Sequence, residues 1–163
     1  MIRSLVFAGY RVTAMTGPTD RKSVAVIEAL GAKFRSFPIG RAGLNPLSDI
    51  RTLFALLQAF LEIKPNIVIA YIIKPVIWSG VALFKLHEVS FFALITGLRF
   101  SFTEATVSRR ILRTITSALY RILLLWCTRV IFQNKNNRDF AVQKNLVSFE
   151  KYFVVDDSGV DIF

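Results

Sequence analysis

The sequence predicts an α/β fold in which helices alternate with the strands of a parallel, doubly wound sheet. The run from Ile67 to Ile73 is continuous, apolar and rich in β-branched residues, as in a strand that is buried on both faces. Other short apolar runs alternate with segments of helical period, which implies right-handed βαβ units. A chain of 163 residues can bury a sizeable core. We therefore expect one domain over residues 1–163, with residues 67–73 as a central strand.

The first part of the chain is divided by glycines and prolines. Gly9 and Gly31 each follow an apolar-periodic segment, in the position of a helix C-terminal stop. Ser48 has the residue type of a helix N-cap. The expected elements are a helix over residues 1–7, a strand over 10–15, a helix over 21–30, a strand over 33–38 and a helix over 48–64.

The second part begins with the 67–73 strand, which ends before Lys74 and Pro75. Because proline is tolerated in the first turn of a helix, we expect Lys74 in the loop between strand and helix. Residues 98–108 have no clear period and are expected to form a loop. The remaining elements are a helix over 76–86, a strand over 90–95, a long helix over 109–128, a strand over 129–132, a helix over 136–144 and a strand over 152–155.

The composition is apolar and strongly basic. Hydrophobic residues make up 53% of the chain, and the mean hydropathy is +0.49. The two apolar segments, 53–63 and 111–127, are shorter than the roughly 20 residues that a membrane span needs, so both are interpreted as helices of a globular domain, with an integral membrane protein as the alternative. The net charge of +10 indicates an anionic partner: lipid headgroups, pyrophosphate or nucleic acid.

The long helix over 109–128 divides into two faces. Leu112, Ile115, Leu119, Ile122, Leu123 and Trp126 form an apolar stripe, and the opposite stripe holds Arg110, Thr114, Ser117 and Arg121. The basic stripe is either a solvated face or a peripheral contact with anionic lipid, to which Arg113 would contribute.

Catalytic and metal-binding motifs are few. The chain has one histidine and one cysteine, which rules out an internal disulfide and leaves no set for a Ser-His-Asp triad or a His-rich metal site. Cys127 is interpreted as a buried, inert thiol. Polar residues instead follow the predicted strands, where α/β sheets bind ligands. These residues are Thr16-Gly17, Lys74, Thr96-Gly97, Gln133-Asn134 and Ser158-Gly159.

Five segments, in order, resemble those of one family. They are Phe37-Pro-Ile-Gly-Arg-Ala-Gly-Leu-Asn-Pro46, Tyr71-Ile-Ile-Lys-Pro75, Ile95-Thr-Gly-Leu98, Phe132-Gln-Asn134 with Asn137-Arg-Asp-Phe140, and Ser158-Gly-Val-Asp161. The chain is similar over nearly its whole length to the acceptor-side domain of family 4 retaining glycosyltransferases of GT-B architecture, in the branch that builds bacterial capsule and O-antigen polysaccharides. It departs from the family pattern at Leu44, Arg99 and Asp156-Asp157.

The resemblance implies a Rossmann-like half of a GT-B fold that is truncated at both ends. The family's first strand and its glycine loop would precede Met1, and its donor-binding domain would follow Phe163. Lys74, Thr96, Gly97 and Asn134 are then expected to bind the acceptor. The hinge towards the donor domain would be Ser158, Gly159, Val160 and Asp161.

The implied parent enzyme transfers a sugar from a nucleoside-diphosphate donor to a polyprenyl-pyrophosphate-linked acceptor. It would use no metal and no cofactor besides the nucleotide-sugar co-substrate, and the chain alone is expected to be inactive. The expected location is cytoplasmic, peripheral to the inner face of the cytoplasmic membrane. The expected partners are the lipid-linked acceptor, the anionic membrane surface through Arg110, Arg113 and Arg121, and a separate donor-domain chain, but no nucleic acid.

Three other functions remain open from the sequence. The first is a non-catalytic half-domain that binds anionic membrane or a partner transferase. The second is the corresponding half of a nucleotide-sugar epimerase, which shares the GT-B architecture. The third is nucleic-acid binding, which fits the charge but lacks a docking motif.

Overall fold

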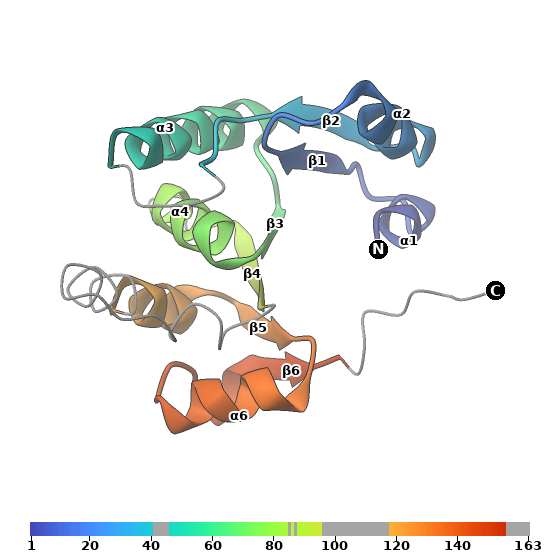
Figure 1. Ribbon diagram of the computed structural model, residues 1–163. Helices are drawn as coiled ribbons and strands as arrows, with labels where there is room; N and C mark the ends of the chain where they lie inside the picture. The colour runs from blue at the N-terminus through green and yellow to red at the C-terminus, as the bar shows by residue number, and fades with distance from the viewer. Residues whose placement is uncertain (41–45, 85, 87, 96–117, 156–163) are drawn as a thin grey trace. The chain divides into compact units, whose positions relative to one another are not determined.

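The computed structural model describes residues 1–40, 46–84, 86, 88–95 and 118–155 (Figure 1). The predicted hinge at 158–161, the acceptor residues Thr96 and Gly97, and the basic residues Arg110 and Arg113 lie outside these ranges. The described chain divides into two compact units, residues 1–58 and 59–163, and each is described by itself.

The first unit contains two parallel strands and helices that end at glycine. Its sheet pairs β1 (Thr13–Thr16) with β2 (Lys33–Ser36) in parallel. The helices α1 (Ile2–Phe7) and α2 (Arg21–Ala29) end as predicted, because Gly9 and Gly31 adopt positive φ angles of 86° and 83°. The amides after each helix then turn back to its last carbonyls, as Gly9 N–H does to the oxygen of Val6 at 2.9 Å. These glycines therefore fix where each helix stops.

The helix α3 (Pro46–Ile63) begins two residues before the predicted start, so Ser48 lies inside the helix and is not its N-cap. The helix is tied to the segment after β2 by Thr52, which is fully buried. The Thr52 hydroxyl lies 2.6 Å from the carbonyl oxygen of Pro38 and 3.0 Å from that of Ser48. This side chain satisfies a backbone carbonyl that follows the strand, which packing alone would leave without a partner.

The second unit contains a four-stranded parallel sheet in the order β3-β4-β5-β6. The strands are β3 (Ile67–Tyr71), β4 (Ser90–Ile95), β5 (Arg129–Phe132) and β6 (Tyr152–Val154). The helices described in this unit are α4 (Ile73–Leu83), a helix over residues 118–126, α6 (Lys135–Gln143) and the short 3-10 helix η2 (Phe149–Lys151). Figure 1 shows the four strands following one another across this unit.

The predicted α/β fold with parallel strands is confirmed, with the strands divided between two sheets. The 67–73 run was predicted to be a central strand, but among the described strands β3 pairs with β4 alone and so forms the edge of the four-stranded sheet. A continuous apolar run reports that both faces of a strand are apolar, but it carries no information on the number of neighbouring strands.

The core of the second unit lies where α4 and the 118–126 helix meet the sheet. Val76 and Ala93 are fully buried, as are Leu124, Val130 and Phe132. Gly80 lets the two helices approach closely, since a Cβ at this position would lie 2.8 Å from Cδ2 of Leu123 and 3.3 Å from Cε1 of Phe91. In the described residues no helix is long and apolar enough to cross a membrane.

Candidate functional site

The candidate site is the end of the four-stranded sheet at which its parallel strands terminate, that is, their carboxyl ends. Parallel pairing sets Tyr71 opposite Leu94, Ile95 opposite Phe132, and Phe132 opposite Val154. The carboxyl ends of the four strands therefore lie side by side. The segments that leave these ends include Lys74 after β3 and Asn134 after β5, so the structure brings these two predicted residues to the same edge.

Lys74 lies in the first turn of α4, not in the loop where the sequence placed it. The strand ends at Tyr71 and the helix begins at Ile73, so the connection is a single residue, Ile72. Pro75 follows in the first turn, where its missing N–H costs no intrahelical hydrogen bond. The short connection brings the cation directly to the end of the strand.

The connecting residue Ile72 has an unusual backbone conformation. Its φ of 66° and ψ of 157° fall in a region that is populated almost only by glycine. The amide of Ile72 still reaches the oxygen of Leu94 at 3.4 Å, and its carbonyl accepts from Val76 at 3.1 Å. The strand ladder and the helix thus meet at one strained residue.

The position of Lys74 is electrostatically unusual. The N-terminal end of a helix carries a partial positive charge, so a cation in the first turn raises the local positive potential. An anion at the same place is favoured by both the helix dipole and the ammonium group. Burial raises the pKa of the hydroxyl of Tyr71, the last residue of β3. The chemistry suited to this end of the strand is recognition of an anion such as a phosphate.

Asn134 is the N-cap of α6. Its side-chain oxygen accepts from the backbone N–H of Asn137 at 2.8 Å. This hydrogen bond fixes the carboxamide at the end of β5 and leaves its NH2 group as a donor. One turn further, Asn137 is a buried polar side chain that the sequence analysis used only as part of a motif. The spacing Asn134-x-x-Asn137 could have predicted the cap, because an N-cap side chain accepts a hydrogen bond from the amide three residues later.

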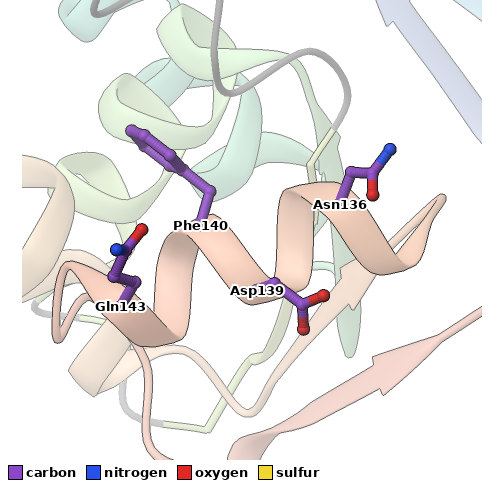
Figure 2. A pocket seen from close by; sticks show the side chains of 4 residues that line it. All are labelled: Asn136, Asp139, Phe140 and Gln143. Atoms are coloured by element: carbon purple, nitrogen blue, oxygen red, sulfur yellow. The ribbon is translucent and has the colours of Figure 1, made fainter.

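A shallow hollow lies elsewhere on the unit, along α6, and is lined by Asn136, Asp139, Phe140 and Gln143 (Figure 2). Figure 2 shows these four side chains spread along one helix without converging on a point. The Asp139 carboxylate is already paired with Arg138 at 2.6 Å. This hollow therefore has no arrangement suited to catalysis.

The long helix differs from its prediction in the part that the structure describes. Arg121 is exposed, as expected for the basic stripe. Ile122 and Trp126, which the sequence placed on the apolar stripe, are also exposed, whereas Leu123 of the same stripe is buried, as are Tyr120, Leu124 and Cys127. The apolar residues of this segment extend well beyond one stripe and leave Arg121 as its single charged residue, so periodicity could not identify which apolar side chains are buried.

Cys127 is buried, as predicted, and its thiol donates to the carbonyl of Leu124 at 3.1 Å. Burial raises the pKa of this thiol to about 11. In the ranges that the structure covers, no cluster of histidine, cysteine and carboxylate residues could hold a metal ion.

Comparison with solved structures gives matches over nearly the whole chain. The structure of MurG from Acinetobacter baumannii matches 96% of this chain with a TM-score of 0.60 at 13% sequence identity. A UDP-N-acetylglucosamine 2-epimerase matches 93% with a TM-score of 0.58 at 17% identity, and the UDP-GlcNAc 2-epimerase from Methanocaldococcus jannaschii matches 91% with a TM-score of 0.55 at 13% identity.

The fold is that of GT-B glycosyltransferases and epimerases. The chain spans less than half of the neighbouring proteins, with 39% of MurG and 40% and 46% of the two epimerases covered. No protein-family model matches the sequence, and no curated protein matches it. The sequence identities show a shared fold and leave the reaction to be argued from the site.

Proposed function

We propose that this chain is the acceptor-side half of a retaining glycosyltransferase that acts on a lipid-linked acceptor in the synthesis of bacterial surface polysaccharide, either capsule or O-antigen. The observation that carries the proposal is the end of the sheet at which Lys74 follows β3 and Asn134 follows β5, with β4 as the strand between them. In α/β folds this edge is where ligands bind. The GT-B-like fold and the five sequence motifs support transfer of a sugar from a nucleoside-diphosphate donor.

The acceptor's pyrophosphate is assigned to the first turn of α4. Lys74 would pair with its charge, and the positive end of the helix would add to the attraction. The NH2 group of Asn134, held by the cap to Asn137, would donate to an acceptor oxygen. Thr96 and Gly97, which follow β4 between these two, are proposed to complete the surface. The donor would be held by a second domain, joined through the proposed hinge at Ser158, Gly159, Val160 and Asp161.

The chemistry proposed for the parent enzyme requires both domains. Departure of the nucleoside diphosphate breaks its bond to the anomeric carbon, and the oxygen of an acceptor hydroxyl forms the new bond on the same face, while the hydroxyl proton passes to an oxygen of the departing diphosphate. Donors preorganised around the leaving diphosphate would lower the barrier by stabilising the charge that develops on it. This chain is proposed to position the acceptor, to use no metal, and to turn over no donor by itself.

The test is binding of a soluble acceptor analogue by the full chain. Farnesyl pyrophosphate is titrated by calorimetry against the parent chain, Lys74→Gln and Lys144→Gln, whose lysine lies exposed just after α6. Loss of one charge-assisted contact is expected to weaken binding about tenfold for Lys74→Gln. The Lys144→Gln variant and the uncharged analogue farnesol separate this effect from net charge and from chain hydrophobicity. Equal weakening by both variants would refute the assignment of the pyrophosphate.

Two alternative functions are each favoured by one observation, and binding experiments distinguish them from the proposed function. The epimerase matches favour a nucleotide-sugar epimerase half, and binding of UDP-GlcNAc instead of farnesyl pyrophosphate would support it. The exposed apolar residues around Trp126 favour a non-catalytic half-domain on an anionic membrane or a partner transferase. In that case vesicle binding would persist with no affinity for either small ligand.

A further inference from the structure

The helix over residues 118–126 has apolar side chains on the face that it turns to solvent. Ile122 and Leu125 are each 50% exposed, and Trp126 is 60% exposed. The opposite face of the same helix is already filled, because Tyr120, Leu123 and Leu124 are buried. The side chains on the exposed face therefore do not contribute to the core of the unit.

A second element contributes to this surface. Phe84 follows the last residue of α4 and is 49% exposed. Its ring lies against the indole of Trp126, with centroids 4.9 Å apart and planes inclined by 56°. Such a tilted aromatic pair holds both rings in place while half of their surface meets water. We call Phe84, Ile122, Leu125 and Trp126 the aromatic patch.

Cations lie beside the aromatic patch. Arg121 is exposed one helical turn before Leu125, and Lys151 donates to the carbonyl of Leu125. Arg129, also exposed, donates to the carbonyl of Thr128 at 2.9 Å. In sequence, Glu150 is next to Lys151, Asp156 and Asp157 follow Lys151 by five and six residues, and Glu88 follows Phe84 by four; Glu88 and Glu150 are exposed. Positive charge thus predominates around the patch, in agreement with the net charge of +10.

We propose that the aromatic patch inserts into the interface of an anionic bilayer, with Arg121, Arg129 and Lys151 contacting lipid headgroups. Tryptophan and phenylalanine flanked by cations partition to the boundary between headgroups and acyl chains. Charge decides between lipid and a second copy of the chain. Two copies that met through this surface would bring their cations together, whereas anionic headgroups neutralise them.

The inference rests on the proposed function in one respect, because a lipid-linked acceptor is reached only by a protein at the membrane surface. It also changes the membrane contact expected from the sequence. Arg121 is shared by both, but the apolar contribution comes from Ile122 and Trp126, which the sequence placed on the apolar stripe opposite the basic one, and from Phe84 and Leu125, which it did not single out. The charged stripe alone would give a purely electrostatic contact, whereas the aromatic patch adds insertion.

The test uses the full chain and vesicles that contain neither acceptor nor donor. The chain is expected to sediment with phosphatidylglycerol vesicles and only weakly with phosphatidylcholine vesicles. Trp126→Ser and Ile122→Ser each remove a large apolar side chain from the bilayer, so partitioning should fall about tenfold or more for Trp126→Ser. Phe153→Ser is the matched control, since Phe153 is 55% exposed on β6. It should leave partitioning unchanged.

A second readout follows the indole itself. The chain has two tryptophans, so a Trp78→Phe variant leaves Trp126 as the only indole. Its emission should shift to shorter wavelength on anionic vesicles and be quenched by lipids brominated in the acyl chain. Arg121→Gln should weaken partitioning more than Lys144→Gln, which removes one exposed cation from the end of α6.

Three results would overturn the inference. They are full partitioning by Trp126→Ser, an emission spectrum that anionic vesicles leave unchanged, and a Trp126→Ser effect on self-association in gel filtration without any effect on vesicles. Because no acceptor is present, these results are independent of farnesyl pyrophosphate binding. Loss of pyrophosphate binding with intact vesicle binding would instead refute the proposed function and leave this inference standing.

Discussion

The side-chain oxygen of Asn134 accepts a hydrogen bond from the backbone N–H of Asn137 at 2.8 Å, at the end of β5 where α6 begins. The residue therefore has a structural role that is independent of any ligand. The same hydrogen bond orients the carboxamide, since an oxygen committed to the cap leaves the NH2 group as the donor. Substitutions can separate the cap from the proposed contact with acceptor.

Asn134→Ala is expected to lower the free energy of unfolding by about 1 kcal/mol, because an N–H at the start of α6 loses its acceptor. Asn134→Asp should keep that stability, since aspartate caps equally well, but it removes the NH2 donor and adds a negative charge. Urea unfolding measures the first effect, and farnesyl pyrophosphate titration measures the second. Asn136→Ala, on the exposed side of α6, is the control and should change stability by less than about 0.5 kcal/mol.

Ile72→Gly is expected to stabilise the chain, although it removes an apolar side chain. Ile72 is an exposed residue at φ 66° and ψ 157°, and such strain costs about 1–3 kcal/mol. Glycine adopts this conformation freely, at an entropic cost of about 0.5–1 kcal/mol. Urea unfolding should show a small net gain. Ile73→Gly, at the first residue of α4, removes a half-buried apolar side chain and should lose about 1 kcal/mol or more, and equal losses for the two variants would contradict the strain.

Gly80→Ala is expected to destabilise the second unit. The added methyl would lie 2.8 Å from Cδ2 of Leu123 and 3.3 Å from Phe91, both buried, so the helices must separate or Leu123 must leave its rotamer. Overpacking of this kind costs about 1–3 kcal/mol, partly offset by about 1 kcal/mol of helix propensity. Thermal unfolding of Gly80→Ala, Leu123→Val and the double variant should show coupling, with Leu123→Val recovering part of the loss.

Local signals in the sequence predicted the elements well. Gly9 and Gly31 marked two helix ends, and the bounds of β4 and β5 were predicted to the residue, because positive-φ stops and apolar strands are set by neighbouring residues. The edge position of β3 could not be predicted, since strand pairing depends on distant segments. Lys74 was predicted near the strand end, but the one-residue connection through Ile72 breaks a local rule on backbone conformation.

Two buried groups near the end of the 118–126 helix predict a loss of stability at alkaline pH. Burial raises the pKa of the Cys127 thiol to about 11, against the opposing effect of Lys151, and burial also raises the pKa of Tyr120 well above its usual value of about 10. The folded protein therefore keeps protons that the unfolded chain releases. Stability is fully present below about pH 8.5 and falls as the pH rises through the folded pKa of Cys127.

Cys127→Ala should flatten this pH dependence by about 2–3 kcal/mol between pH 8 and 11, measured by urea unfolding at several pH values. The slope, not the stability at pH 7, is the relevant quantity, because the variant also leaves a small cavity.

Tyr120→Phe is the companion variant. Among the described residues the buried Tyr120 hydroxyl has no hydrogen-bond partner, so removing it should cost no stability at pH 7 and can recover part of a desolvation penalty of about 1–3 kcal/mol. An alkaline slope that both substitutions together leave unchanged would show that these two groups titrate alike in the folded and unfolded chains.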